Sequence, residues 1–183
     1  MASLDKKPTI MAVCLARGGS KGIPRKNIRF VGGKPLLAWC VDAAIESKVF
    51  DKVYVSTDSL EIARISAARG YNIHERDPST ATDGASSESG VADFLRHHPD
   101  CDICCLLQAT SPMTTAAHIA EAYEQFQRDG ADSLVTVVRT HRFMWKVNED
   151  GTAGPMNYDP VHRPRRQDWN GGYIMCHKTF GFI

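Results

Sequence analysis

Several features that define common classes of protein are missing from this 183-residue chain. It has no apolar run long enough to cross a bilayer, because the stretch from Ile10 to Ala16 is too short, and no cleavage site for secretion follows it. Its formal net charge is only +1, so no overall field directs it to nucleic acid or to an anionic membrane. We therefore expect neither partner, and any basic binding site must be local.

The glycine motifs of the common nucleotide-binding folds are missing as well. Neither G-x-G-x-x-G nor G-x-x-x-x-G-K-[ST] occurs, so neither dinucleotide nor P-loop chemistry is indicated. Among six cysteines, Cys101 and Cys104 form a C-x-x-C, but no second Cys/His pair follows at zinc-finger spacing. Cys105 leads directly into an apolar run, so we interpret these cysteines as part of a buried strand in a reducing compartment.

What the chain does have is an alternation of strand-like and helix-like segments. The predicted strands are 9–15, 52–57, 71–75, 103–107 and 133–138, and the helices between them include 36–45, 62–69 and 115–128. This order predicts a single α/β domain over residues 1–183, with a mostly parallel sheet and helices on both faces. Past Arg139 the alternation stops. We expect a strand over 143–147 that a turn at 148–151 closes, a basic, proline-containing segment over 156–170, and one more strand over 173–176.

A glycine-rich, basic loop, residues 15–27 (LARGGSKGIPRKN), follows the first predicted strand. Ligands bind at the carboxyl ends of strands in such sheets. Glycines let backbone N–H groups approach phosphate oxygens, and Ser20 adds a hydroxyl donor. The glycines are Gly18, Gly19 and Gly22, and the cations are Arg17, Lys21, Arg25 and Lys26. The loop predicts a triphosphate site, with a solvated basic loop as the alternative.

Two further polar segments follow the third and fourth predicted strands. Residues 76–87 are rich in short hydroxyl side chains that suit a nucleobase, although a surface loop in which Ser87 caps the next helix explains them equally well. Gln108 begins the other segment, and its amide can both donate and accept. Thr110 and Ser111 beside it either contact a ligand or only shape the turn before Pro112.

The segment 163–167 combines one proline with three arginines, Arg163, Arg165 and Arg166. Arginine suits bidentate binding of a carboxylate or phosphate. A solvated basic turn and a nuclear localisation patch are the alternatives.

Four stretches occur in the order LARGGSKGIPRKNI, VSTD, LLQATSP and RPRRQDW. Together they resemble the CMP-sialic acid synthetases (N-acylneuraminate cytidylyltransferases), with RPRRQDW pointing to the animal type. The resemblance implies a Rossmann-like nucleotidyltransferase fold. It also implies that CTP and an N-acylneuraminate react to give CMP-N-acylneuraminate and pyrophosphate. A cytidylyltransferase for another keto-sugar acid of eight or nine carbons is the closest alternative.

The resemblance also assigns roles to residues. It implies that Arg165 and Lys21 are catalytic. Position 85, where the family has a second hydroxyl, is alanine here. The residues implied to bind nucleotide or substrate are Arg17, Ser20, Lys26, Asn27, Arg76, Ser87, Gln108, Arg163 and Arg166.

The family's cofactor is Mg²⁺, held by the aspartates of a late I-D-[IV]-D motif that this sequence does not contain. We therefore name no metal ligand and expect a C-terminally truncated member. A truncated form that binds nucleotide or pairs with full-length subunits without turnover is the alternative function.

The resemblance further implies a nuclear location, with the cytoplasm as alternative. It also implies a homo-oligomer (a dimer or dimer of dimers) assembled through an insertion at 140–170 that includes His141, Phe143 and Trp145.

Overall fold

The computed structural model describes residues 7–140, 142–165, 168, 172–174 and 180–183. The chain divides into two compact units, residues 1–136 with 177–183 (unit 1) and residues 137–176 (unit 2). The segment 140–170 that we expected to be an insertion falls within unit 2. In the part of the chain that is described, no helix is both long and apolar enough to cross a bilayer.

A six-stranded sheet forms the centre of unit 1, in the order β5-β4-β1-β6-β12-β7. β1 pairs in parallel with both β4 and β6, and β4 pairs in parallel with β5. β12 is antiparallel to β6 and β7, an insertion that the sequence did not predict. The mostly parallel sheet is confirmed. The strands are Ile10–Leu15 (β1), Lys52–Thr57 (β4), Asn72–Glu75 (β5), Ile103–Leu107 (β6), Leu134–Val135 (β7) and Phe180–Phe182 (β12).

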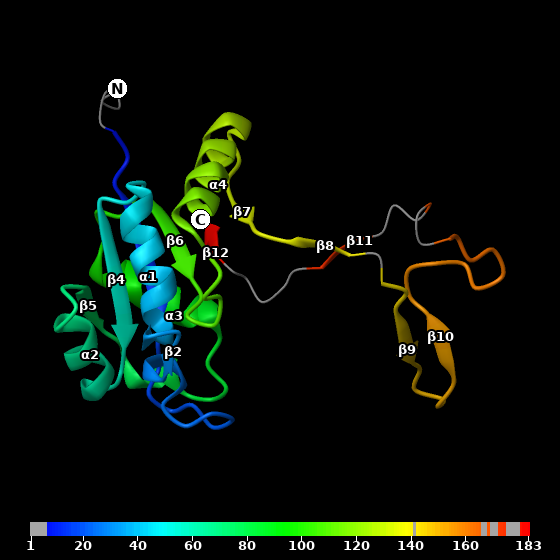
Figure 1. The fold of residues 1–183 in the computed structure, drawn as a ribbon, viewed down its shortest axis with the longest axis horizontal. Helices are drawn as coiled ribbons and strands as arrows, with labels where there is room; N and C mark the ends of the chain where they lie inside the picture. The colour runs from blue at the N-terminus through cyan, green and yellow to red at the C-terminus, as the bar shows by residue number, and fades with distance from the viewer. Residues whose placement is uncertain (1–6, 141, 166–167, 169–171, 175–179) are drawn as a thin grey trace. The chain divides into compact units, whose positions relative to one another are not determined.

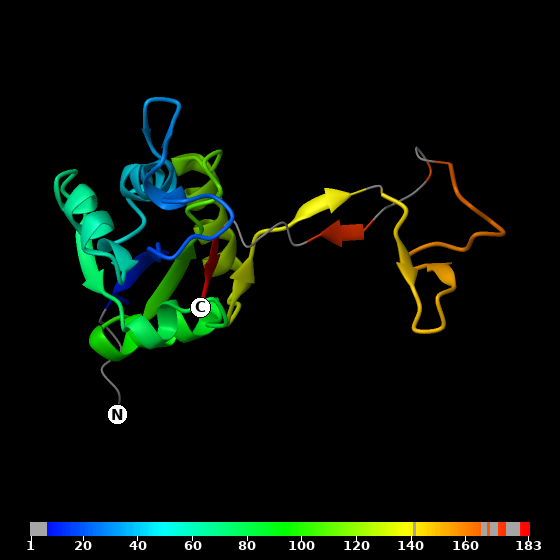
Figure 2. The same ribbon diagram turned by 90° about the horizontal axis from the view of Figure 1, so that it is seen from below.

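Helices cover both faces of this sheet, as predicted. Side chains alternate along a strand, so Ala12 and Cys14 of β1 join the core formed with α1, α2 and α4, whereas Met11 and Val13 join the core formed with α3. Figure 2 shows α3 on the face opposite α1. The helices are Leu36–Ser47 (α1), Leu60–Ala67 (α2), Ser87–His97 (α3) and Ala116–Asp129 (α4), with short 3-10 turns at Lys26–Ile28 (η1) and Pro78–Ala81 (η2).

Side-chain caps determine where three of these helices begin. The hydroxyl oxygens of Ser59 and Thr115 accept hydrogen bonds from backbone N–H groups in the first turns of α2 and α4. Ser86 caps α3 by accepting from the N–H of Ser89 at 3.1 Å. The interpretation of Ser87 as that cap was therefore wrong by one position. Ser87 is instead the first residue of the helix.

Two local features differ from the prediction. A hairpin of β2 (Phe30–Val31) and β3 (Lys34–Pro35) turns through Gly32 and Gly33, whose φ angles of +58° and +91° favour glycine. The predicted strand 133–138 is split, because β7 ends at Val135 and the chain then enters unit 2.

Unit 2 contains two short antiparallel pairs. β8 (Val138–Thr140) pairs with β11 (Gly172–Ile174), and β9 (Trp145–Val147) pairs with β10 (Ala153–Pro155). The turn predicted at 148–151 connects β9 and β10, and Gly151 adopts a φ of +79° there. Figure 1 shows both pairs.

Candidate nucleotide-binding site

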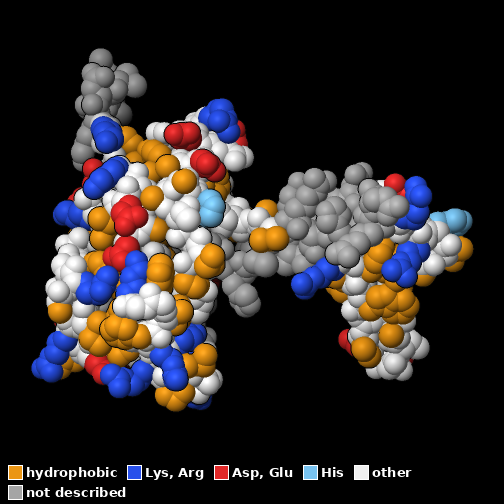
Figure 3. Space-filling view, in the orientation of Figure 1, with side chains coloured by type: hydrophobic (Ala, Val, Ile, Leu, Met, Phe, Trp, Pro, Cys, Tyr) orange, Lys and Arg blue, Asp and Glu red, His pale blue; other side chains and the backbone are white. Residues whose placement is uncertain are grey.

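A cavity of about 490 Å³ lies where the loops that follow β1, η2 and β6 meet. β1 lies between β4 and β6, so successive βα units leave it in opposite directions, and this is the position where open α/β sheets bind ligands. Lys and Arg side chains gather around the end of unit 1 at which β4 ends (Figures 1 and 3). The cavity brings together eight predicted site residues: Arg17, Ser20, Lys21, Lys26, Asn27, Arg76, Ser87 and Gln108.

Asn27 holds the basic loop in place. Its side chain is buried, and its Nδ2 donates to the carbonyl oxygen of Arg17 at 3.0 Å. Arg25, two residues earlier, adopts a left-handed φ of 58° and forms an ion pair with Glu61 of α2. Of the four loop cations, Arg17, Lys21 and Lys26 line the cavity, whereas the charge of Arg25 is paired with Glu61.

Gly18 is required by close packing rather than by a phosphate. A Cβ at this position would lie 2.9 Å from the Cβ of Ser59. Its N–H donates to Oδ1 of Asp58 at 2.9 Å, so this donor already has a carboxylate partner. Of the three loop glycines only Gly22 lines the cavity, and there is open space around it.

Asp83 is a site residue that the sequence did not reveal. Its carboxylate oxygens lie 2.8 Å from Nη2 of Arg17 and 2.5 Å from Nζ of Lys21. The hydrogen bonds from Lys21 and Arg17 lower the pKa of Asp83 below its usual value. The carboxylate of Asp83 therefore bridges Arg17 and Lys21, the two cations that we expect to bind phosphate. Its position in a polar, turn-rich loop gave no signal of this role.

Arg76 forms a buried wall of the same cavity. Its guanidinium donates from Nε to the hydroxyl of Thr80 at 3.0 Å and from Nη2 to the carbonyl oxygen of that residue. Burial lowers the pKa of Arg76, and the carboxylates of Asp58 and Asp93 oppose this effect. A Cβ at position 90 would lie 2.7 Å from Nη2 of Arg76, so Gly90 gives the guanidinium the room to cross α3.

The beginning of α3 completes the cavity wall. Ser86 and Ser87 both line the cavity, and the positive end of a helix dipole favours bound anions. Thr110 also lines the cavity, whereas the N–H of Ser111 donates to the carbonyl oxygen of Gln108 and closes the turn. The wall thus combines four cations with amide and hydroxyl groups, which suits a nucleoside triphosphate.

The sequence profile of the cytidylyltransferase family matches residues 11–180 of the chain. The chain belongs to the cytidylyltransferase family.

The chain is similar in sequence to curated proteins named N-acylneuraminate cytidylyltransferase. The chain is 47% identical over 169 residues to N-acylneuraminate cytidylyltransferase A of Danio rerio, covering 91% of this chain and 39% of that protein. It is 44% identical, with the same coverage of both chains, to N-acylneuraminate cytidylyltransferase of Oncorhynchus mykiss. The enzyme of that name from Streptococcus agalactiae is 42% identical over 68% of this chain and 31% of its own length. The cytidylyltransferase described here thus spans less than half the length of these relatives.

Solved structures share the fold. A CMP:2-keto-3-deoxy-manno-octonic acid synthetase complexed with CTP has a TM-score of 0.70 at 19% identity, covering 96% of this chain and 73% of that one. A 4-diphosphocytidyl-2C-methyl-D-erythritol synthase from Anaerococcus prevotii has a TM-score of 0.67 at 15% identity, with 96% and 71% covered. At these identities the likeness establishes the fold alone, and the predicted Rossmann-like nucleotidyltransferase fold is confirmed.

The arginine segment of this cytidylyltransferase belongs to unit 2. The Arg163 guanidinium lies 4.6 Å from the ring centre of Phe143. Nε of Arg165 donates to Oδ2 of Asp168 at 2.6 Å. Arg166 and His141 lie outside the described residues. The site residues predicted in this segment therefore belong to a different compact unit from the cavity.

The described residues do not fit a magnesium ion held by the protein. None of the side chains that line the cavity is a carboxylate, although Mg²⁺ requires oxygen ligands. Two acids that contact the basic loop already have partners there. Asp58 accepts from the N–H of Gly18, and Asp83 is paired with Arg17 and Lys21. The sequence contains one D-x-D, at residues 100–102. This motif precedes β6 at the amino edge of the sheet, where Asp102 accepts from the N–H of Thr9 at 2.7 Å.

Proposed function

We propose that this chain is the nucleotide-binding part of an N-acylneuraminate cytidylyltransferase, which joins CMP from CTP to a sialic acid. The observation that carries the proposal is the cavity at the switch point of the sheet, where Arg17, Lys21 and Lys26 face hydroxyl and amide groups. Its volume of about 490 Å³ lies within the range of small-molecule sites. The named relatives at 42–47% identity support a sialic acid as the sugar.

Each part of the cavity has a role in this proposal. Arg17, Lys21 and Ser20 bind the triphosphate, and Asn27 positions Arg17 through its carbonyl oxygen. Arg76, Gln108 and the hydroxyl of Ser87 line the side that receives the nucleoside. Lys26, at the start of η1, adds a fourth positive charge to the wall.

The reaction is an in-line displacement at the α-phosphorus. The anomeric hydroxyl oxygen of the sugar forms a bond to this phosphorus and gives up its proton to water, while the bond from this phosphorus to the oxygen of the β-phosphate breaks and pyrophosphate leaves. Lys21 neutralises charge on the departing phosphates, since preorganised cations stabilise developing charge. Arg163, Arg165 and Arg166 bind the sugar carboxylate and phosphate, with Arg165 catalytic. Where a divalent cation takes part, the triphosphate would have to carry it, because no carboxylate lines the cavity.

We further propose that unit 2 assembles copies of the chain into a homo-oligomer. It exposes large apolar side chains, among them Trp145, Val147 and Val161, which are 54–80% accessible. Exposed apolar surface of this kind is typical of interaction sites.

The basic segment 163–166 is the reason for proposing a nuclear location, with the cytoplasm as the alternative.

Pyrophosphate release from CTP and N-acetylneuraminate with Mg²⁺ tests the proposed function, with ATP in place of CTP as the specificity control. We expect saturable CTP binding by calorimetry and pyrophosphate release that requires the sugar. Binding of CTP without release would reject catalysis and favour a nucleotide-binding form that pairs with longer subunits. Absence of CTP binding would reject the site altogether.

Substitution of Asp83 tests whether its carboxylate occupies the phosphate position. We expect Asp83→Asn to bind CTP several-fold more tightly, because the triphosphate no longer displaces an anion from Arg17 and Lys21. Calorimetric titration with CTP measures the change. Asp77→Asn is the control, because the Asp77 carboxylate accepts from the N–H of Ser79 rather than from Arg17 or Lys21. Weaker binding in Asp83→Asn would instead assign Asp83 a supporting role in the site.

A further inference from the structure

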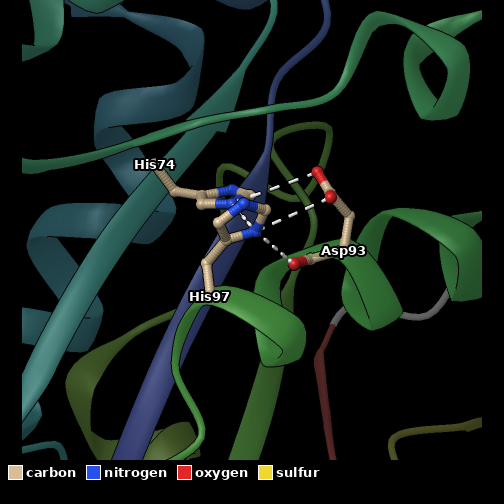
Figure 4. Close-up of side chains that lie close together, drawn as sticks. All are labelled: His74, Asp93 and His97. Atoms are coloured by element: carbon tan, nitrogen blue, oxygen red, sulfur yellow. Dashed lines mark hydrogen bonds and ion pairs between the residues drawn. The ribbon is translucent and has the colours of Figure 1, made fainter.

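Two histidines and an aspartate converge on the face of the sheet that α3 covers (Figure 4). His74 belongs to β5, and Asp93 and His97 lie one turn apart on α3. Nε2 of His74 lies 3.5 Å from Nδ1 of His97 and 4.0 Å from Oδ2 of Asp93. Nδ1 of His97 lies 3.7 Å from Oδ1 of Asp93. Neither the cavity nor the proposed reaction uses these groups.

These separations are close to those of a zinc site. Ligands about 2.0–2.1 Å from a tetrahedral zinc ion are separated by about 3.3–3.5 Å from one another. The two ring nitrogens already lie 3.5 Å apart. The two histidines face different oxygens of Asp93, at 4.0 and 3.7 Å, and one ligand atom from each of the three residues lies within 4.8 Å of the others, so rotation of the side chains brings a single carboxylate oxygen into the set. We propose that His74, Asp93 and His97 bind a divalent zinc ion, with water as the fourth ligand.

The surroundings of the cluster support a metal site. Nδ1 of His74 lies 3.0 Å from the hydroxyl of Ser56, which leaves Nε2 facing the carboxylate. His74 and Asp93 are buried, with 5% and 1% of their surfaces accessible. The exposed ring of His97 gives the ion access from solvent.

An adjacent hollow of about 280 Å³ leads to the cluster. Asp58, Glu75 and Asp77 line it together with His97. Three carboxylates at its wall attract a divalent cation, and only one cation, Arg76, lines it as well. This second observation is independent of the spacing of the three ligands.

Binding of the ion replaces two interactions of the metal-free protein. Oδ1 of Asp93 accepts from Nη2 of Arg96 at 2.9 Å, and Nδ1 of His97 lies 2.9 Å from the carbonyl oxygen of Asp93. The side chain of Arg96 is 61% exposed, so solvent can replace the partner that its guanidinium loses. Oδ2 of Asp93 accepts from the N–H of Asp77, next to Arg76, so an occupied site holds the start of the loop that borders the cavity.

Calorimetric titration of EDTA-treated, dialysed protein with zinc chloride, without nucleotide, tests the site. We expect one saturable equivalent in the wild type and at least tenfold weaker binding in His97→Ala. Because His97 is exposed, this variant is expected to fold. Zinc should raise the midpoint of thermal unfolding in the wild type but not in His97→Ala, and Co²⁺ should give the visible absorption of a tetrahedral site only in the wild type.

Two variants control for binding elsewhere. His162→Ala removes an exposed histidine that pairs with Asp159 at 2.8 Å, and Cys101→Ser removes a half-buried thiol. We expect both to bind zinc as the wild type does. Equal affinity in the wild type and His97→Ala, loss of binding in either control, or no saturable binding would overturn the proposal. None of these outcomes depends on CTP, so the result is separate from the test of the cytidylyltransferase function.

Discussion

Arg17→Ala is expected to weaken CTP binding by ten- to a hundredfold. Arg17 lines the cavity and already binds the carboxylate of Asp83 at 2.8 Å, which shows that its guanidinium reaches an anion there. A hydrogen bond to a charged group contributes about 1.5–3 kcal/mol, and each 1.4 kcal/mol corresponds to about tenfold in affinity. Calorimetric titration with CTP measures the loss.

Arg29→Ala is the matched control for this prediction. Arg29 belongs to the same basic segment, but it follows η1, is exposed and does not line the cavity. We expect its substitution to change CTP affinity by no more than about twofold, since exposed charges act weakly through solvent. The Arg17 guanidinium also donates to the carbonyl oxygen of Ala81 at 3.3 Å, so thermal unfolding must show that Arg17→Ala is folded. Equal losses in the two variants would refute the placement of the triphosphate beside Arg17.

Phe94→Ala is expected to produce the largest loss of stability among single substitutions on α3. The side chain of Phe94 is fully buried. Its ring packs edge-on against Tyr54 of β4 and His74 of β5, with centroids 5.2 and 5.4 Å apart. Removal of a buried phenylalanine ring costs about 3–5 kcal/mol, because the transfer energy is lost and a cavity remains. Urea unfolding at equilibrium measures the change.

Leu60→Ala is the control for Phe94→Ala. Leu60 is 66% exposed on α2, so we expect its substitution to change the free energy of unfolding by no more than about 0.5 kcal/mol. A loss below about 1 kcal/mol in Phe94→Ala would contradict the described packing of α3. Because Ser86 and Ser87 at the start of α3 line the cavity, a folded Phe94→Ala protein should also bind CTP less tightly.

The strands and helices of unit 1 follow largely from local patterns. The continuous apolar run at 10–15 and the alternating segments after it predicted a parallel sheet, and β1, β4, β5 and β6 have that arrangement. Local periodicity does not report which segments pair over long distances. For that reason the insertion of β12 between β6 and β7 was not predicted.

For the cavity too, the sequence predicted which segments meet but not how individual side chains pair. Placing Arg17, Arg76 and Gln108 near one another required only the rule that polar segments after parallel strands meet at one edge of the sheet. The partners of individual charges did not follow from this rule. Arg25 is paired with Glu61, 36 residues away, and Gly18 donates to Asp58, 40 residues away.

The sequence by itself determined the fold class, the cytidylyltransferase family and eight of the residues that line the cavity, because these depend on short motifs and on periodicity within single elements. Only the tertiary structure decided that Asp83 bridges Arg17 and Lys21, and that His74 of β5 meets Asp93 and His97 of α3. Such groups have no common motif. They come together because the sheet order and the position of α3 on its face bring distant parts of the chain within a few ångströms of each other.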